Sequence, residues 1–351
     1  MKFKLPVWNG VKNSSYEKQK IRNIEIQSSS IKGIFTRKDY NFVDYQKDYV
    51  HMTPLKWTGY IKNIRDIKTN FIKENLKSVG SCLEVGAGDD FNLRTLNYKK
   101  FIICDPFIKS YKKNKIEFIR DFYEKINFKE KFDTIIMFSV LEHTSNFSEF
   151  LKKTKEILNI KGRFFLEIPI IDNQFLSGDF NSLLHEHVNY FSKSGVFNLM
   201  KKFNFEIESF YFKNDAGFFC IKHFEKKNYI LEKSLPSLHT CQKIFNNKIL
   251  KFLIFLKKNK DRRIVFYGAN NGLNNLLYIC QKRIKIKKNK ILIVDSDRNK
   301  WGKYIGSYKN HITKPSIIKK SDLICVSSLS FYDEIVSKLS KNNQIISLND
   351  I

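Results

Sequence analysis

Between residues 80 and 170 the chain contains a series of short, almost continuous apolar runs. They lie at Cys82–Val85, Phe101–Cys104, Ile116–Ile119, Thr134–Phe138 and Arg163–Ile168. Runs of this length between turn residues are typical of buried strands. Helix-like stretches separate several of them, notably Phe147–Leu158. This alternation predicts a parallel sheet with helices on both faces.

The flanking segments complete this sheet. Apolar residues recur at helical spacing from Thr53 to about Leu76, which predicts a helix that leads into the first strand. A helix at Lys193–Lys202 is followed by two closely spaced β-type runs, Glu206–Phe212 and Phe218–His223. These two runs are expected to form an antiparallel pair at the sheet edge. Residues 1–50 show no clear periodicity and are treated as an N-terminal extension.

A second α/β pattern follows a long amphipathic helix at about Ser237–Lys257. Its expected strands are Arg263–Tyr267, Ile291–Val294, Leu323–Val326 and Ile345–Leu348, with a helix at Asn271–Gln281. A length of 351 residues suits two or three domains. We therefore expect a Rossmann-like seven-stranded α/β domain at 51–228, a linking helix at 229–260 and a smaller Rossmann-like domain at 261–351.

The formal charge of +28 changes this picture only slightly. The lysines are spread along the whole chain, which favours solvated surfaces over a dedicated nucleic-acid face. We therefore expect no nucleic-acid partner, although an anionic substrate would be attracted. None of the six cysteines forms a CxxC pair, so neither a zinc site nor a disulfide framework is indicated.

The sequence gives no sign of a targeting or membrane segment. The N-terminus lacks an apolar signal core, and the longest apolar run, Ile249–Leu256, is interrupted by Lys251. We expect a cytoplasmic protein without a membrane span. Nothing in the sequence fixes its oligomeric state.

The first expected strand ends in a glycine-rich turn that carries three carboxylates. Gly86 and Gly88 allow the backbone to bend and to approach a ligand closely. A dinucleotide fingerprint would place a pyrophosphate here, but Glu84, Asp89 and Asp90 would repel it. The cationic, zwitterionic methionine end of S-adenosylmethionine (SAM) suits these charges, so the turn predicts SAM rather than NAD.

Acidic residues also follow the second and third strands. Asp105 is placed to bind ribose hydroxyls, as acidic residues at this position do in nucleotide-binding sheets. Asp121 and Phe122 are candidates for the edge and the face of the adenine ring. Helix capping is the alternative role for Asp105 and Asp121, because both precede helix-like stretches.

The fourth strand ends in a loop that contains Ser139, Glu142 and His143. Ligands bind along the carboxyl edge of open α/β sheets. We therefore expect Ser139 and Glu142 to contact the cofactor and His143 to contact the substrate. The alternative is that Glu142 and His143 simply begin a helix.

A long loop, from Pro169 to about Phe191, carries the segment His185-Glu186-His187. Two imidazoles and a carboxylate at the active edge suit general acid–base chemistry, since a methyl acceptor must lose a proton. Hydrogen bonding of the loop to the domain is the structural alternative. The HEH spacing differs from the zinc-binding HExxH motif, so we expect no metal. Candidate substrate contacts in the same segment are Asn189 and Tyr190.

Several segments together resemble the sugar C-methyltransferases that act on nucleotide-linked deoxy-keto sugars. They are the glycine turn, His185–Ser192 (HEHVNYFS), Tyr267–Gly272, Val294–Asp297 and Lys300–Gly306. The resemblance covers residues 40–351. It implies SAM as the methyl donor, S-adenosylhomocysteine as the product and a nucleotide-linked sugar as the substrate.

The resemblance also implies roles for individual residues. It makes His187 the base and Glu186 its neighbour, and it places Tyr45 and Tyr49, loosely, near the methyl donor. The C-terminal module would frame the nucleotide-sugar cleft rather than bind NAD.

Two departures from the family pattern concern the acceptor atom. Members usually begin with a four-cysteine zinc domain, whereas no cysteine precedes Cys82 here. Members also tend to carry a tyrosine where this chain has Leu184. We therefore favour slightly the methylation of a sugar hydroxyl, with C-methylation of a keto-deoxysugar as the alternative. A nucleic-acid methyltransferase and a non-catalytic nucleotide-sugar-binding protein are further alternatives.

Overall fold

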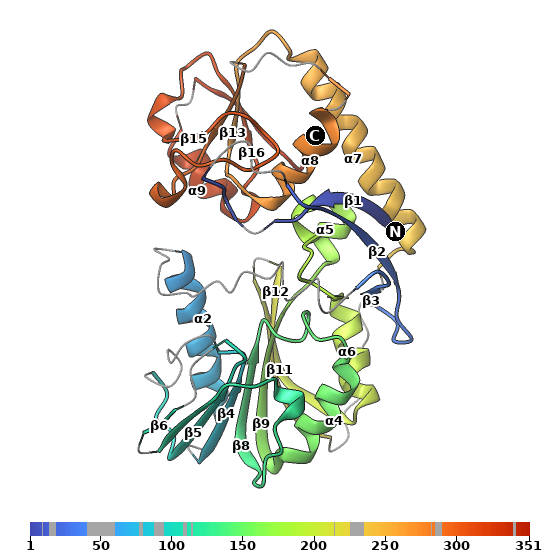
Figure 1. Ribbon diagram of the computed structural model, residues 1–351, viewed down its shortest axis with the longest axis vertical. Coiled ribbons are helices and arrows are strands. Elements are labelled where there is room, and N and C mark those ends of the chain that lie inside the picture. Colours follow the sequence, from blue (N-terminus) through green and yellow to red (C-terminus); the bar gives the residue numbers. More distant parts are fainter. Residues whose placement is uncertain are drawn as a thin grey trace.

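The computed structural model contains three β-sheets and helices packed around them (Figure 1). It describes residues 1–8, 10–13, 19–40, 60–76, 80–87, 95–107, 111–113, 115–213, 215–224, 235–281, 283–284, 290–339 and 342–351.

The largest sheet is the predicted α/β sheet. Its strands are β4 (Ser81–Val85), β5 (Lys100–Cys104), β6 (Tyr111–Lys113), β7 (Ile116–Ile119), β8 (Phe132–Phe138), β9 (Leu158–Pro169), β11 (Phe205–Lys213) and β12 (Ala216–His223). They lie in the order β11-β12-β9-β8-β4-β5-β7-β6. The neighbouring pairs β9 and β8, β8 and β4, β4 and β5, and β5 and β7 are parallel. Strand β12 is antiparallel to both β9 and β11. The seven predicted strands, which include the closing antiparallel pair, are confirmed, and the short β6 extends one edge.

Helices cover both faces of this sheet because neighbouring strand residues point in opposite directions. Cys82 belongs to a core with helix α2 (Tyr60–Asn75), whereas Leu83 belongs to a core with α4 (Phe147–Ile157) and α6 (Lys193–Lys202). Side-chain caps begin α4 and α6: Asn146 accepts from the Glu149 N–H and Ser192 from the Gly195 N–H. The strand ends are thereby held in a two-sided core.

Residues near the N-terminus form a small antiparallel sheet that the sequence pattern did not predict. Strands β1 (Lys2–Pro6), β2 (Ile21–Ser28) and β3 (Ile34–Arg37) pair in order with β10 (Asn189–Phe191). The burial of Phe3 and Leu5 between exposed lysines is a period-2 signal that could have revealed β1. This sheet joins the N-terminal residues directly to the end of the segment His185–Ser192, which is called the HEH segment below.

The C-terminal unit is a parallel five-stranded sheet in the order β15-β14-β13-β16-β17. Its strands are β13 (Ile264–Tyr267), β14 (Ile291–Val294), β15 (Ile312–Thr313), β16 (Leu323–Val326) and β17 (Gln344–Ser347). Its helices are α7 (Leu238–Lys258), α8 (Asn271–Gln281) and α9 (Tyr332–Ser337), with 3₁₀ turns at Arg298–Lys300, Pro315–Ile317 and Leu329–Phe331. The four predicted strands are confirmed, and β15 is additional.

The segment after β9 is more structured than the long loop that the sequence suggested. It contains helix α5 (Asp172–Ser177) and the 3₁₀ turn η3 (Phe180–Ser182) before β10. Its apolar residues share one core with β1–β3, α7 and α8. Figure 1 shows α5 and β1 between the two α/β units. Within the described residues, we find no helix with the length and apolar character that a membrane crossing requires.

Candidate active site

An open cavity lies at the carboxyl ends of β4, β5 and β8, with about 790 Å³ of empty space that includes open solvent. This is the edge where open α/β sheets bind ligands. Predicted site residues that line it are Gly86, Asp105, Phe122, Ser139 and His143. Tertiary structure therefore gathers the ends of several strands around one space.

Gly86 adopts a left-handed backbone conformation, with φ of +69°. A Cβ at this position would lie 2.5 Å from Cγ2 of Val140, which comes from the loop after β8. The Gly86 N–H donates to the carbonyl of Cys104 at 2.8 Å, which joins the turn to the end of β5. The glycine is therefore needed both for its φ and for the close approach of two loops.

Asp105 and Asp121 each accept a backbone hydrogen bond. Oδ1 of Asp105 accepts from the Phe107 N–H, and Oδ1 of Asp121 accepts from the Phe122 N–H, both at 2.8 Å. Asp105 is buried and lines the cavity, whereas Asp121 is half-buried and does not line it. Both aspartates therefore shape their loops, and Asp105 also presents its carboxylate to the site.

The loop after β8 begins with a strained residue. Ser139 has a φ of +56°, which is uncommon outside glycine. Its hydroxyl donates to Oε2 of Glu167 at 2.7 Å, and Nζ of Lys68 lies 3.1 Å from the same oxygen. This network holds the loop that carries Val140, Glu142 and His143.

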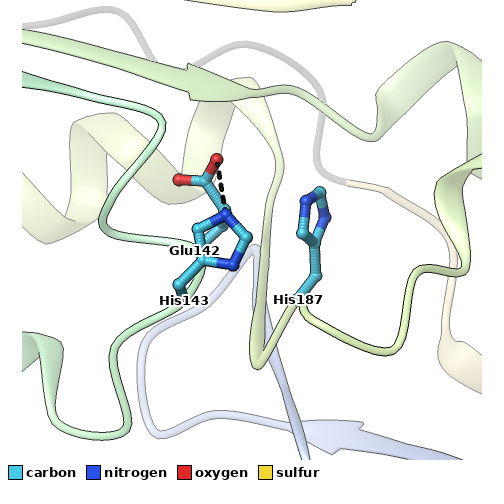
Figure 2. A group of neighbouring side chains, drawn as sticks. All are labelled: Glu142, His143 and His187. Carbon is cyan, nitrogen blue, oxygen red and sulfur yellow. Dashed lines mark ion pairs between the residues drawn. The ribbon is translucent and has the colours of Figure 1, made fainter. Parts of the chain in front are cut away.

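Glu142, His143 and His187 form a compact side-chain cluster next to the cavity (Figure 2). The two imidazole centroids are 5.1 Å apart, and Nε2 of His143 lies 3.7 Å from Oε1 of Glu142. Nδ1 of His143 is 2.8 Å from the carbonyl oxygen of Glu186. The tertiary fold thus joins the two predicted histidine-bearing loops, which are 43 residues apart in sequence.

Burial dominates the protonation equilibria of this cluster. It raises the pKa of Glu142 well above its usual value, and the Glu167 carboxylate raises it further. Burial lowers the pKa of His143 to about 4, and it lowers the pKa of His187 well below its usual value. Burial also raises the pKa of Glu186 to about 7. Both imidazoles are therefore uncharged at neutral pH.

Hydrogen bonds to backbone groups fix the HEH segment from both sides. The carbonyl of Glu142 accepts from the N–H groups of Val188 and Asn189, at 2.7 and 3.0 Å. On the other side, the Arg37 guanidinium donates to the carbonyl of His185 at 2.7 Å and pairs with Asp39. The segment is thus held between the loop after β8 and strand β3.

None of the five predicted residues of the segment, His185, Glu186, His187, Asn189 and Tyr190, lines the cavity. His185 is buried, and so is Asn189, whose amide donates to the carbonyls of Leu141 and Thr144. Tyr190 is buried and directs its hydroxyl to the carbonyl of Leu184, at 3.4 Å. In this structure Asn189 and Tyr190 stabilise the loop, which is the structural alternative for the segment.

Other site predictions fall elsewhere. Glu84 is buried in β4, directly before the glycine turn. Gly88, Tyr45 and Tyr49 lie outside the described residues.

The cavity lining also includes Tyr40 and Phe107, which the sequence analysis did not select. Burial raises the pKa of Tyr40 to about 12, and the Phe107 side chain is an exposed aromatic surface at the cavity. An aromatic residue directly after Cys104-Asp105-Pro106 was the available signal for Phe107.

The glycine turn of the C-terminal unit is filled by protein atoms. A Cβ on Gly268 would lie 2.0 Å from Oγ of Ser328, and one on Gly272 would lie 2.9 Å from the Asn181 nitrogen. Asp295 accepts from the Ala269 N–H and from Nζ of Lys300, both at 2.8 Å. Close packing and internal hydrogen bonds therefore account for this turn.

Comparisons with known proteins agree with the position of the cavity. Residues 58–209 match the sequence model of a family described as a methyltransferase domain. This range includes the cavity-lining residues from Val85 to Phe150. A search of curated proteins gave no match.

Solved structures similar to this chain include several methyltransferases. One is a SAM-dependent methyltransferase from Clostridium acetobutylicum, with 11% identity and a TM-score of 0.37, covering 47% of this chain and 92% of its own. Another is the 1,6-didemethyltoxoflavin-N1-methyltransferase of Burkholderia thailandensis, with 12% identity and a TM-score of 0.43, covering 57% and 100%. The N-methyltransferase NodS of Bradyrhizobium japonicum has 11% identity and a TM-score of 0.35, covering 47% and 97%.

The family match and the strand-end cavity coincide in one part of the chain. The predicted SAM-type glycine turn and Asp105 lie at that cavity, where a donor with a ribose and a cationic methionine end would fit. The chain contains a region, residues 58–209, that matches a methyltransferase domain.

Proposed function

We propose that this methyltransferase transfers a methyl group from SAM to a hydroxyl of a nucleotide-linked sugar, in the biosynthesis of a surface polysaccharide or glycoconjugate. The observation that carries the proposal is the position of His143. It lines the cavity that contains Gly86 and Asp105, and its ring contacts His187 of the HEH segment. A methyl donor and an acceptor bound at these two places would be neighbours.

Residues of the first three loops would hold the donor. Gly86 gives the backbone close access, Asp105 offers a carboxylate to the ribose hydroxyls, and Phe122 offers an aromatic face to the adenine. Glu84, Gly88, Asp121, Glu142, Tyr45 and Tyr49 are further proposed donor contacts. SAM supplies a methyl group that is activated by its positively charged sulfur.

The histidine cluster would prepare the acceptor. An uncharged imidazole can accept a proton, so His187 is the proposed base, with Glu186 and His185 beside it. The rigid hydrogen bonding of the loop would hold the acceptor oxygen in line with the methyl carbon, and such orientation supplies much of the rate of two-substrate reactions. The hydrogen bonds of the Asn189 and Tyr190 side chains to loop carbonyls would keep the loop in this geometry.

The sugar substrate is proposed from the sequence resemblance of the HEHVNYFS segment and the C-terminal module. The net charge of +28 would attract the pyrophosphate of a nucleotide-linked sugar. Leu184, in place of the family's tyrosine, favours oxygen over carbon as the acceptor atom.

The test is methyl transfer from isotopically labelled SAM to GDP-, dTDP-, UDP- and CDP-linked sugars, with NMR of each product. A labelled methoxy signal is expected. A labelled methyl on a ring carbon would replace O-methylation by C-methylation. If the protein binds SAM but methylates no sugar and does methylate RNA, the sugar proposal is wrong.

A further inference from the structure

Three side chains beside the donor cavity provide a carboxylate and two imidazoles at metal-binding separation. One potential ligand atom from each of Glu142, His143 and His187 lies within 4.8 Å of the others. We propose that these residues bind a divalent transition-metal ion, which in turn binds hydroxyl oxygens of the methyl acceptor. This inference rests on the proposed function and deepens it, because it assigns a task to the cluster at that same site.

His143 is oriented as a metal ligand would be. Nδ1 lies 2.8 Å from the Glu186 carbonyl oxygen, and since a carbonyl only accepts, Nδ1 carries the hydrogen. The uncharged ring then has a lone pair on Nε2, which lies 3.7 Å from Oε1 of Glu142. Metal-binding histidines commonly donate their second N–H to a backbone carbonyl, which fixes the ring in this way.

Glu142 provides an independent indication of a missing positive group. Its side chain is 2% exposed, and its buried Oε2 has no hydrogen-bond partner among the residues that the structure describes. The nearby Glu167 adds negative charge, and Lys68 already contacts that carboxylate. A lone pair and a carboxylate oxygen that face each other in a buried site are stabilised by a cation between them.

The three proposed metal ligands restrict which ions can bind, and they leave coordination positions for the substrate. Imidazole ligands suit zinc, copper, iron and nickel, whereas carboxylate suits harder ions such as manganese. A site with three protein ligands keeps coordination positions open for water or substrate, as catalytic metal sites do. Because His143 also lines the donor cavity, those positions lie near the methyl group that is to be transferred. Two neighbouring hydroxyls of a sugar ring are a chemically matched acceptor.

Metal binding would change how the acceptor loses its proton. A cation lowers the pKa of an oxygen that it binds, so the hydroxyl would release its proton to water. The oxygen would then form a bond to the methyl carbon while the bond between that carbon and sulfur breaks, leaving a neutral thioether. In this arrangement His187 would serve as a metal ligand, and this role would replace the role of base that the proposed function gives it.

Mn²⁺ alone is the probe for the site, with no acceptor present. Binding is measured by the loss of the free-ion EPR signal during titration of the full chain. We expect one saturable site per chain, weakened at least tenfold by Glu142→Gln and by His187→Ala. His239→Ala is the matched control, because it removes an exposed imidazole from α7, and Mn²⁺ affinity should not change. Thermal unfolding followed by circular dichroism reports whether each variant retains the fold.

A measurement on the unaltered chain covers the case in which a variant does not fold. Pulsed EPR of bound Mn²⁺ is expected to show ¹⁴N couplings from imidazole. The inference is overturned if no saturable site exists, if the couplings are absent, or if folded variants bind Mn²⁺ as tightly as the unaltered chain.

The two proposals fail separately. Equal sugar methylation before and after complete removal of metal would overturn the metal site alone. Tight Mn²⁺ binding at the cluster without methylation of any sugar would overturn the sugar substrate alone.

Discussion

The side-chain amide of Asn271, at the start of α8, donates to the carbonyl of Leu183 at 3.1 Å, two residues before His185. The same amide is 3.3 Å from the carbonyl of Phe180, which also accepts from the amide of Asn275 at 3.2 Å. Asn271 and Asn275 are buried. The C-terminal unit therefore fixes the backbone that leads into the HEH segment, although its residues are about ninety positions away.

Replacing Asn271 with Leu is expected to loosen this segment. The change keeps the branched shape and the number of side-chain heavy atoms but leaves buried carbonyls without their donor, which costs about 1–3 kcal/mol. Hydrogen exchange of residues 180–188 should become faster, while SAM affinity should not change because Asn271 does not line the cavity. Asn343→Leu is the control, since the Asn343 amide also donates to two carbonyls, but at an exposed site. Equal exchange in the segment for both variants would contradict the role of Asn271.

Replacing Gly86 with Ala is expected to lower SAM affinity and stability together. The new Cβ would clash with Val140 and would adopt a left-handed conformation, which costs about 1–2 kcal/mol. Gly302→Ala is a matched control, because Gly302 has a φ of +76° and no atom within 4 Å of a Cβ. Calorimetric titration with SAM should show weaker binding only for Gly86→Ala. Unchanged SAM binding in that variant would exclude the Gly86 turn from the donor site.

Replacing His187 with Ala is expected to reduce turnover by about 10²–10⁴-fold, the usual contribution of a group that activates an acceptor. SAM affinity should be retained, because His187 does not line the cavity. Both quantities are measured once the labelled-methyl assay has identified an acceptor. Turnover equal to that of the unaltered chain would remove His187 from the mechanism.

The half-buried Asp179 should make stability depend on pH. Burial raises its pKa to about 6, although the Asn181 N–H that it accepts has a lowering effect. A folded-state pKa above the unfolded value of 3.8 means that the folded chain binds the proton more tightly. The contribution of this group is therefore fully present below about pH 4 and is lost as pH rises to about 6.

Asp179→Asn keeps the acceptor oxygen and removes this titration. The stability of the variant relative to the unaltered chain should rise by about 1–2 kcal/mol between pH 4 and pH 7, since solvent screening at this half-buried site reduces the full effect of the pKa shift. Urea unfolding at a series of pH values measures the difference, and parallel stability curves would refute the prediction. Asp297→Asn is the control for cap geometry, because half-buried Asp297 accepts from the Asn299 N–H in the same way.

The sequence by itself determined the strands of both α/β units, the long helix α7 and the glycine turn at Gly86. These features arise from local periodicity and local backbone requirements, which are written in consecutive residues. The position of Asp105 after the second strand was also readable, because parallel strands bring their carboxyl ends to one edge.

Only the tertiary structure decided which of these residues meet. It joined His143 to His187, placed Arg37 and Asn271 on the backbone around the HEH segment, and buried Asn189 as a support of the loop. Such pairings depend on how distant elements pack, and a local pattern carries no information about a partner that is many residues away. The filled glycine turn at Gly268 has the same origin, since its sequence suits either a ligand or the close approach of Ser328.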